Sequence, residues 1–383
     1  MNNKGEVMRK SMGLSIEVGK HRVLTREAVR EPQLLRLRNG DLLLTCHVQS
    51  DTHFAERHGL RSRDGGKTWK PAPRRAHREQ AIGQGADGTV LAFDIYTFER
   101  KPGEYVASYF RSDNGGATFT GPHESVVFVN SVASGEYPTP DQFPAKDHPM
   151  RHFYQPLPTY YEQIVRKSSQ RTGMGFWRYL IERNGRWLAP MQGKFHGDGF
   201  YRTILVASED GGKTWTFVST IADRCGGVAD DGFCEPALIG VADGSLLCVM
   251  RRGGGLPLAQ CRSTDGGNTW SPPELLAGHG VDPDLVLMSN GVLACTYGRP
   301  GMHIMFSEDG CGYSWGYRTA IGDWLSSCYM GIAEVDPGKL LLVYDRCDAG
   351  PNEDHRDPNK CHVGSTTLSV RLKTRNPAVP KTR

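Results

Sequence analysis

Short stretches of alternating apolar and polar residues run through most of this chain, and glycine-containing turns separate them. The clearest stretches share one pattern, in which an alternating segment, usually an N-G or D-G pair, and an apolar run follow one another. Alternation with a period of two predicts β-strands, and such a pair between two strands predicts a tight hairpin. Six segments fit the pattern, with central glycines at Gly40, Gly88, Gly185, Gly244, Gly291 and Gly338.

A second repeat, S-x-D-x-G-x-T-W, follows most of these hairpins. Three copies have nearly the same residues. Of two weaker copies, one has Asn in place of the Asp and the other has one extra residue. Aspartate bonds its own backbone in turns and glycine supplies positive φ, so the motif predicts a turn between strands. We therefore expect the Asp residues of this repeat to form turns rather than to catalyse. The copies occupy residues 62–69, 112–119, 208–215, 263–270 and 307–315.

The spacing of the hairpins predicts the architecture. Four of the five gaps between the central glycines are 47 to 59 residues, and a period near 50 with four strands per unit is typical of a β-propeller. Six units predict an all-β, six-bladed propeller. The gap between Gly88 and Gly185 is about twice the period and contains a stretch rich in Pro and Tyr. We interpret residues 134–172 as a long loop inserted between blades 2 and 3, with a degenerate seventh blade as the alternative.

The sixth unit has no turn motif after it, so its outer strands must come from elsewhere. The segment 364–372 and an N-terminal strand near 13–18 supply the alternation needed. Such a closure removes exposed sheet edges. We expect residues 1–383 to form one propeller domain, with a flexible tail over 373–383.

Composition and charge argue against a nucleic-acid-binding protein and against a membrane-spanning one. A net charge of +4 dispersed over 383 residues argues against nucleic acid as a partner, and no apolar run approaches the 18 residues of a membrane span. The N-terminal segment lacks an apolar core typical of secretory signals, so we expect a cytoplasmic protein. Ten cysteines without a C-x-x-C pair predict reduced thiols and no zinc site. No cofactor or metal is expected, and nothing in the sequence indicates an oligomeric state.

Aligning the hairpins on their glycines predicts where chemistry gathers. In a propeller the ends of the innermost strands surround the central channel, and acids, His, Arg and Tyr recur at the aligned positions. Charged groups that converge on one axis require partners or a ligand. Nine residues before the glycine are Glu31, Glu79, Phe176, Glu235, Asp282 and Tyr329. Seven residues after it are His47, Ile95, Gln192, Arg251, Gly298 and Asp345.

The turn motif is the Asp-box, and the chain resembles the sialidase superfamily over residues 25 to 345. Six positions match that family's functional residues in order along the chain. Arg30, in VREPQ, matches the first arginine of the family's triad, and Arg251 and Arg299 match the other two. Glu235 and Tyr329 open later inner strands, as the family's glutamate and tyrosine do.

The resemblance implies an exo-acting, retaining glycoside hydrolase for an acidic sugar. Three arginines grip a substrate carboxylate through charge-assisted bonds. A tyrosine nucleophile avoids the repulsion between that carboxylate and an anionic nucleophile. Tyr329 is then the nucleophile and Glu235 takes its proton. Asp51, on the loop before the first Asp-box, matches the acid/base residue.

One departure keeps other functions open. The residue after Arg30 is Glu31, where sialidases have an apolar residue, and His47 ends the same strand pair. We therefore count Glu31, His47 and Asp282 among the substrate-binding residues. The first alternative is a superfamily enzyme for a uronic or neutral sugar. It would use paired acids or a His/Tyr lyase pair, and the acids would be drawn from Glu31, Glu79, Glu235 and Asp282. The second alternative is a non-catalytic propeller that binds glycans.

Overall fold

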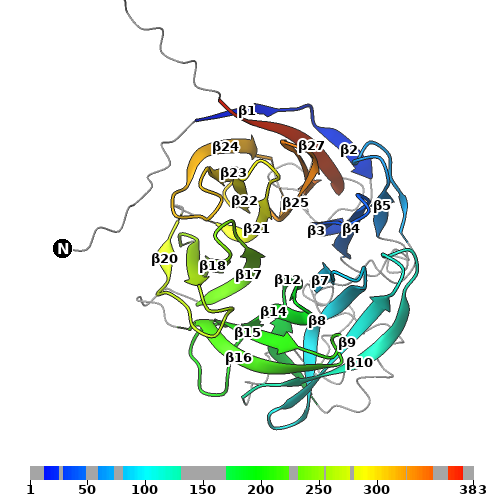
Figure 1. Cartoon of the computed structure of the whole chain (residues 1–383), viewed down its shortest axis with the longest axis vertical. Helices are drawn as coiled ribbons and strands as arrows, with labels where there is room; N and C mark the ends of the chain where they lie inside the picture. The colour runs from blue at the N-terminus through cyan, green and yellow to red at the C-terminus, as the bar shows by residue number, and fades with distance from the viewer. Residues whose placement is uncertain are drawn as a thin grey trace, which may run out of the picture.

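We describe a computed structural model of the chain. It covers residues 13–25, 29–48, 59–72, 81–130, 170–223, 232–253, 256–276, 280–324, 326–347 and 361–373, with the backbone alone for a few of them, Arg30 and His47 included. Every regular element in these ranges is a β-strand, which confirms the all-β prediction. Figure 1 shows the sheets set around a central axis, so that the fold is propeller-like. Most of the segment 134–172 lies outside the described residues.

Three sheets each contain four consecutive antiparallel strands. Their innermost strands are β3, β17 and β21, and these lie around the axis in Figure 1. The first sheet consists of β3 (Val29–Arg36), β4 (Leu42–Val48), β5 (Leu60–Ser62) and β6 (Lys70–Pro71). The second consists of β17 (Phe233–Gly240), β18 (Leu246–Arg252), β19 (Ala259–Ser263) and β20 (Glu274–Leu275). The third consists of β21 (Val281–Leu287), β22 (Leu293–Gly298), β23 (Met302–Ser307) and β24 (Gly316–Gly322).

A ten-stranded sheet lies between the first two of these. Two antiparallel runs are joined in it, because β10 pairs with β16 in parallel and β11 pairs with both β8 and β14. The first run is β7 (Ala81–Gln84), β8 (Val90–Lys101), β9 (Glu104–Ser112) and β10 (Thr120–Phe128). The second is β11 (Gln170–Phe176), β13 (Ile181–Arg183), β14 (Arg186–Gly193), β15 (Arg202–Ser208) and β16 (Thr214–Ala222), and β12 (Arg178–Tyr179) pairs with β7 in parallel.

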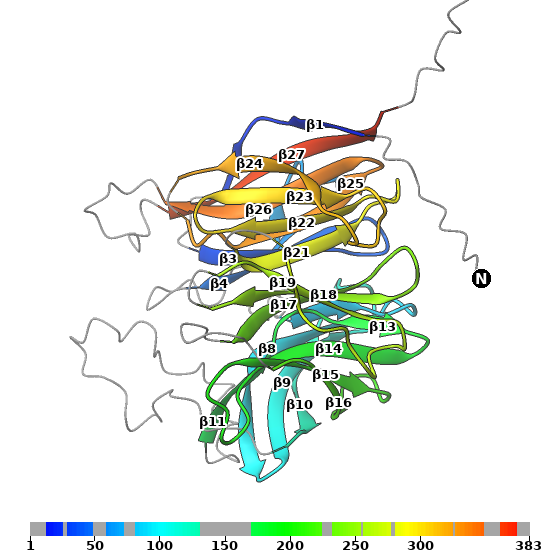
Figure 2. The same ribbon diagram turned by 90° about the vertical axis from the view of Figure 1, so that its left-hand side faces the viewer.

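The last sheet contains strands from both ends of the described chain. It is built from β25 (Met330–Asp336), β26 (Lys339–Cys347), β27 (Cys361–Leu372) and β1 (Leu14–Val18), and β2 (Arg22–Thr25) also pairs with β27. Strand β1 runs antiparallel to β27, from the pair Leu14↔Leu372 to the pair Val18↔Leu368. Figure 2 shows β1 along the outer edge of β27. The predicted closure is confirmed.

The Asp-boxes form the turns that their sequence predicts. In the first copy, Asp64 Oδ1 accepts hydrogen bonds from the Thr68 amide at 2.9 Å and from Ser62 Oγ at 2.9 Å, and Asp64 Oδ2 accepts one from Thr68 Oγ1 at 2.6 Å. Asn114 replaces the Asp in the second copy, and its Oδ1 accepts from the Thr118 amide at 2.9 Å. These carboxylates and this amide are turn formers, as expected.

The second glycine of each box also joins neighbouring sheets. A Cβ at Gly267 would lie 2.3 Å from Leu205 Cδ2, and one at Gly66 would lie 2.5 Å from Leu341 Cδ2. Both glycines have positive φ, a conformation that other residues seldom adopt. The turn of one sheet therefore packs directly on the apolar strands of the sheet before it. The six hairpin glycines also have positive φ, as the hairpin pattern predicts.

The described cysteines Cys234, Cys248, Cys261, Cys295, Cys311 and Cys328 are free thiols. Five of them are buried, and Cys248 and Cys261 belong to an apolar cluster between sheets. In the described ranges, no helix has the length and apolarity needed to cross a membrane.

Candidate active site

Three inner strands share the same irregularity, a shift in pairing register near their start. Strands β3, β17 and β21 each contain an acid followed by proline near their start, and the pairing register shifts there. Proline has no amide hydrogen for the ladder, so a bulge forms at this point. The acids Glu31, Glu235 and Asp282 have φ values of 54°, 48° and 41°. Left-handed backbone at non-glycine residues is costly and clusters at functional sites.

Tyr329 and Glu235 make a direct contact at this end of the axis. Tyr329 precedes β25, its side chain is buried, and its hydroxyl donates a hydrogen bond to Glu235 Oε1. Arg251, at the end of β18, donates from Nη1 to the same oxygen at 2.6 Å. The Asp282 amide donates to Glu235 Oε2 at 2.8 Å, and the Glu235 amide donates to Gln192 Oε1. The carboxylate of Glu235 is thus held on both oxygens.

Burial and charge keep the Tyr329 phenol protonated. Burial raises the pKa of Tyr329 well above its usual value, and the negative charges of Glu235, Glu31 and Asp282 raise it further. Burial by itself would lower the pKa of Arg251, but the charge of Glu235 raises it above its usual value. Any reaction at the Tyr329 oxygen therefore requires a base for its proton, and Glu235 is already hydrogen-bonded to it.

Arg299 lies beside this pair. Its guanidinium carbon is 5.9 Å from the centroid of the Tyr329 ring, and its Nη2 donates to the Ser327 carbonyl at 2.8 Å. The side chain is exposed, unlike that of Arg251, which is partly buried. The structure therefore brings together four of the residues singled out from the sequence, namely Glu235, Arg251, Arg299 and Tyr329.

Asp282 is close to this pair but turned away from solvent. Only 2% of the residue is exposed, and its carboxylate accepts hydrogen bonds from Arg178 and from Trp177 Nε1. Burial raises the pKa of Asp282 to about 7; Arg178 opposes this rise and the charge of Glu235 adds to it.

Arg178 was missed by the glycine alignment, which put Phe176 at the axis. Phe176 instead lies in the apolar core, with its ring 4.8 Å from that of Phe93. Arg178, with φ of 53°, adopts the left-handed conformation of Glu31, Glu235 and Asp282. Its hairpin is shorter, so it stands seven residues before Gly185, and the others stand nine before their glycines. The only signal in the sequence was a charged residue inside the apolar segment FWRYL.

Most of the remaining predicted residues are described by their backbone alone or lie outside the described residues. Arg30 pairs with His47 through the backbone of β3 and β4, and their side chains lie outside the described part. Asp51 and Glu79 lie outside the described residues altogether. Glu31 is partly exposed, and its charge acts on Tyr329. In the described residues no group of three His, Cys, Asp or Glu is arranged to hold a metal ion.

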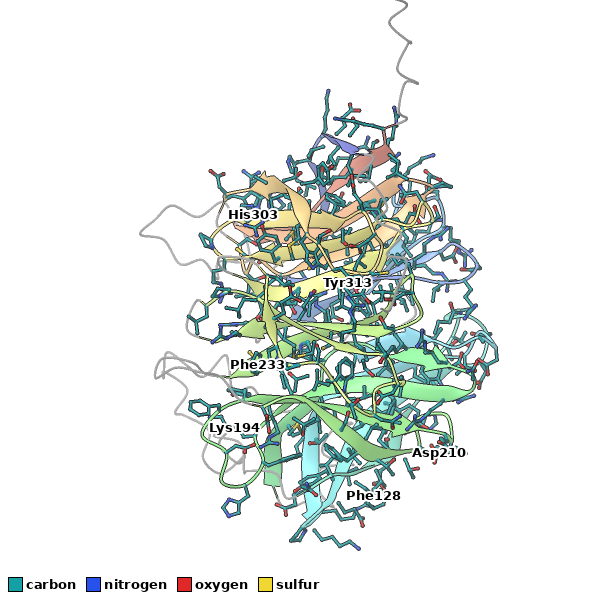
Figure 3. All side chains as sticks on the ribbon, turned by 60° about the vertical axis from the view of Figure 1, so that its left-hand side comes forward. Phe128, Lys194, Asp210, Phe233, His303 and Tyr313 are labelled. Carbon is teal, nitrogen blue, oxygen red and sulfur yellow. The ribbon has the colours of Figure 1, made fainter. Side chains whose placement is uncertain are left out.

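Figure 3 labels residues on two faces of the molecule, and the strand pairing shows which face holds the site. The pair Phe233↔Arg252 ends the β17–β18 hairpin beside Glu235 and Arg251, and an Asp-box follows Ser263, which pairs with Leu246 at the other end. Phe233, two residues before Glu235, lies on the same face as Lys194 and His303, and Asp210 of an Asp-box lies on the opposite face. The candidate site therefore faces away from the Asp-box turns.

Family models match the repeats on which this architecture is built. A BNR repeat-like domain model matches residues 160–324, and a BNR/Asp-box repeat model matches residues 60–71. These matches support the resemblance to the sialidase-like BNR superfamily. A search of curated proteins found no match.

Solved structures similar to this chain include glycoside hydrolases. A Dyadobacter fermentans protein of unknown function has a TM-score of 0.65 at 17% identity, covering 93% of this chain and 99% of the other. A Fusarium graminearum α-L-arabinofuranosidase in complex with arabinobiose has a TM-score of 0.61 at 16% identity, covering 92% and 97%. A Hadza microbial sialidase has a TM-score of 0.55 at 17% identity, covering 90% of this chain and 65% of that one. At these identities the likeness shows the fold.

Proposed function

We propose that the chain is an exo-acting, retaining glycoside hydrolase on a six-bladed propeller, with Tyr329 as nucleophile and Glu235 as its base. The ten-stranded sheet counts as two of the six blades. The observation that carries the proposal is the buried hydrogen bond from the Tyr329 hydroxyl to Glu235, with Arg251 on the same carboxylate oxygen. A buried phenol bonded to a carboxylate has a ready acceptor for its proton.

The chemistry follows from these contacts. The Tyr329 oxygen attacks the anomeric carbon as its proton passes to Glu235, and the bond from that carbon to the leaving oxygen breaks. Asp51 gives a proton to the leaving oxygen and then takes one from the water that cleaves the tyrosyl intermediate, while Glu235 returns its proton to the phenol. Two displacements at one carbon retain its configuration. Arg251 donates to the same Glu235 oxygen that receives the phenol proton, so it holds that oxygen in place.

We propose a glycoside of an acidic sugar as the substrate. Arg299 is exposed and lies over the Tyr329 ring, and Arg251 is within reach of the same space, so two cations border the nucleophile. Arg30 completes the set in the proposal. Guanidinium groups bind a carboxylate through bidentate, charge-assisted bonds.

A neutral sugar is the second candidate, and Glu31 is the observation that favours it. The charge of Glu31 acts on Tyr329, so it would also repel the carboxylate of an acidic substrate. An α-L-arabinofuranoside is a suitable test compound of this class, because a structurally similar protein was solved in complex with arabinobiose.

The experiment measures hydrolysis of fluorogenic α-sialosides and α-L-arabinofuranosides by the wild type and by Tyr329→Phe. We expect turnover of one class by the wild type and a loss of about 10²-fold or more in the variant. Tyr109→Phe is the matched control, because Tyr109 is also buried but stacks on Phe93 in the ten-stranded sheet. A folded wild-type protein without turnover of any glycoside in a broad panel would overturn the proposal.

A further inference from the structure

Arg178 connects three inner strands at the axis, and its side chain is fully buried. It belongs to β12, and its Nε donates to Asp282 Oδ1 of β21 at 2.9 Å. Its Nη2 donates to the Asp282 carboxylate and carbonyl, and also to the Met330 carbonyl of β25 at 3.0 Å. Its Nη1 lies 3.2 Å from Asp284 Oδ2. One planar guanidinium thus fixes two strands relative to its own.

Asp282 passes this constraint on to Glu235. The Asp282 amide donates to Glu235 Oε2 at 2.8 Å, and this direction depends on the left-handed backbone of Asp282. That conformation carries a steric penalty for any residue with a Cβ. The Asp282 carboxylate is anchored by Arg178 and by Trp177 Nε1 at 3.0 Å, so the side-chain contacts hold the backbone in place.

Met330 passes the constraint to Tyr329, because the two residues are adjacent in the chain. The bond from Arg178 to the Met330 carbonyl therefore fixes the backbone beside the phenol. Both members of the Tyr329–Glu235 pair are therefore held in place by the same guanidinium. Tyr329 is held through its neighbour Met330, and Glu235 is held through the Asp282 amide.

The buried charge cluster of Arg178, Asp282 and Asp284 is costly, which indicates a role other than stabilising the fold. Burying a guanidinium with two carboxylates requires the desolvation of three charges, and such groups seldom add net stability over apolar residues of similar size. Asp284 and Asp282 are both fully buried beside Arg178, and burial raises the pKa of each. An apolar core would fill the same space without this penalty.

We infer that Arg178 is a positioning residue, which holds the Glu235 carboxylate against the Tyr329 phenol through Asp282 and Met330. The inference rests on the proposed function. Arg178 lies behind the pair and contacts no substrate, so it acts on the rate of the chemical step and leaves substrate binding unchanged.

The test compares steady-state kinetics of three variants with the wild type. Arg178→Lys keeps the positive charge but loses the planar guanidinium, which donates to Asp282 and to the Met330 carbonyl at the same time. Asp282→Asn removes the charged anchor and keeps the amide, and Asn tolerates left-handed backbone. Asp284→Asn is the matched control, a carboxylate-to-amide change on the same guanidinium without contact to Glu235.

We expect kcat to fall about tenfold to a hundredfold in Arg178→Lys and Asp282→Asn, with KM changed less than about twofold, because a small misplacement of catalytic groups lowers the rate steeply. Asp284→Asn retains kcat within about twofold, since the path from Arg178 to the pair runs through Asp282 and Met330 and not through Asp284. Wild-type kcat in folded Asp282→Asn overturns the inference. Equal loss of folding in Asp282→Asn and Asp284→Asn also overturns it, because the role is then structural.

A wild type without activity would refute the proposed function alone. Crystal structures of the wild type and Asp282→Asn then decide the inference. It predicts that the Glu235 carboxylate moves away from the Tyr329 hydroxyl in the variant, and an unchanged pair overturns it.

Discussion

The Tyr329 hydroxyl donates a hydrogen bond to the Glu235 carboxylate across 94 residues of sequence. The two residues come from different sheets, and the contact exists because the inner strands of those sheets surround one axis. Arg251 donates to the same oxygen, so a guanidinium and a phenol are both bonded to one carboxylate.

Glu235→Gln should lower kcat by about 10²–10⁴-fold, because the amide cannot accept the phenol proton in the transition state. Steady-state kinetics on the substrate class that the wild type turns over will measure this. Glu334→Gln is the control, since Glu334 accepts bonds from the Ser289 and Gly338 amides at hairpin turns, at the ends of the inner strands away from the site. Equal activity of Glu235→Gln and the control would exclude Glu235 as the base.

Arg299→Gln should distinguish an acidic from a neutral substrate. Its exposed guanidinium lies over the Tyr329 ring, where a substrate carboxylate is expected. Loss of one charge-assisted bond, worth about 1.5–3 kcal/mol, raises KM for a carboxylated glycoside by about 10- to 100-fold. A neutral glycoside should be hydrolysed with KM nearly unchanged. An unaltered KM for a carboxylated substrate would remove Arg299 from the binding site.

Asp282 should make stability fall as pH rises from about 4 to about 7. Its pKa is raised to about 7 in the folded protein, whereas an unfolded Asp has a pKa near 3.9. The folded state therefore binds this proton more tightly, and the contribution of Asp282 to the free energy of unfolding is largest below pH 4. Urea unfolding of the wild type and Asp282→Asn across this range measures the difference. We expect the advantage of the wild type to shrink with pH, by up to about 1.4 kcal/mol per unit. A constant difference would show that Asp282 has its ordinary pKa.

Asp210→Ala should destabilise the protein without changing the kinetics of the folded fraction. Asp210 accepts bonds from the Lys213 and Thr214 amides at 3.0 and 2.9 Å and from Thr214 Oγ1 at 2.7 Å. Their loss should lower the free energy of unfolding by about 1–3 kcal/mol. Asp210→Asn should be milder, because Asn114 makes equivalent bonds in the second box. Thermal unfolding ranks the variants, and equal Tm values for the two would contradict the turn-forming role.

Deletion of residues 1–19 should lower Tm and promote association. Strand β1 pairs with β27 over five residues, and its removal exposes the backbone of β27 as a sheet edge. Thermal unfolding and light scattering measure the two effects. Alanine at the exposed Glu17 is the control, because it leaves the backbone pairing intact. Wild-type Tm and a monodisperse solution after deletion would show that the closure adds no stability.

The repeats explain how much of the fold is readable from sequence. Alternation and turn chemistry are local, so the hairpins, the Asp-box turns and the closure by β1 and β27 follow from short segments. The positions of Glu235 and Tyr329 follow because each stands nine residues before the glycine of its hairpin, and Arg251 follows because it stands seven residues after Gly244.

Arg178 shows where this reasoning fails. Its hairpin is two residues shorter, so alignment on Gly185 put Phe176 at the axis and Arg178 inside the strand. The partners of Arg178 lie more than 100 residues away, and no local pattern specifies them. The ten-stranded sheet was missed for a similar reason, since the parallel pairing of β10 with β16 joins segments that are distant in sequence.

The pairing of β1 with β27 also bears on the synthesis of the protein. The sheet that begins with β25, directly after Tyr329, also contains the strand from residues 14–18 and the strand from residues 361–372. A growing chain on the ribosome contains residues 14–18 long before residues 361–372, their partner strand, have been translated. The proposed nucleophile is therefore placed in a finished sheet only after translation of β27, so that a prematurely terminated chain would be catalytically silent.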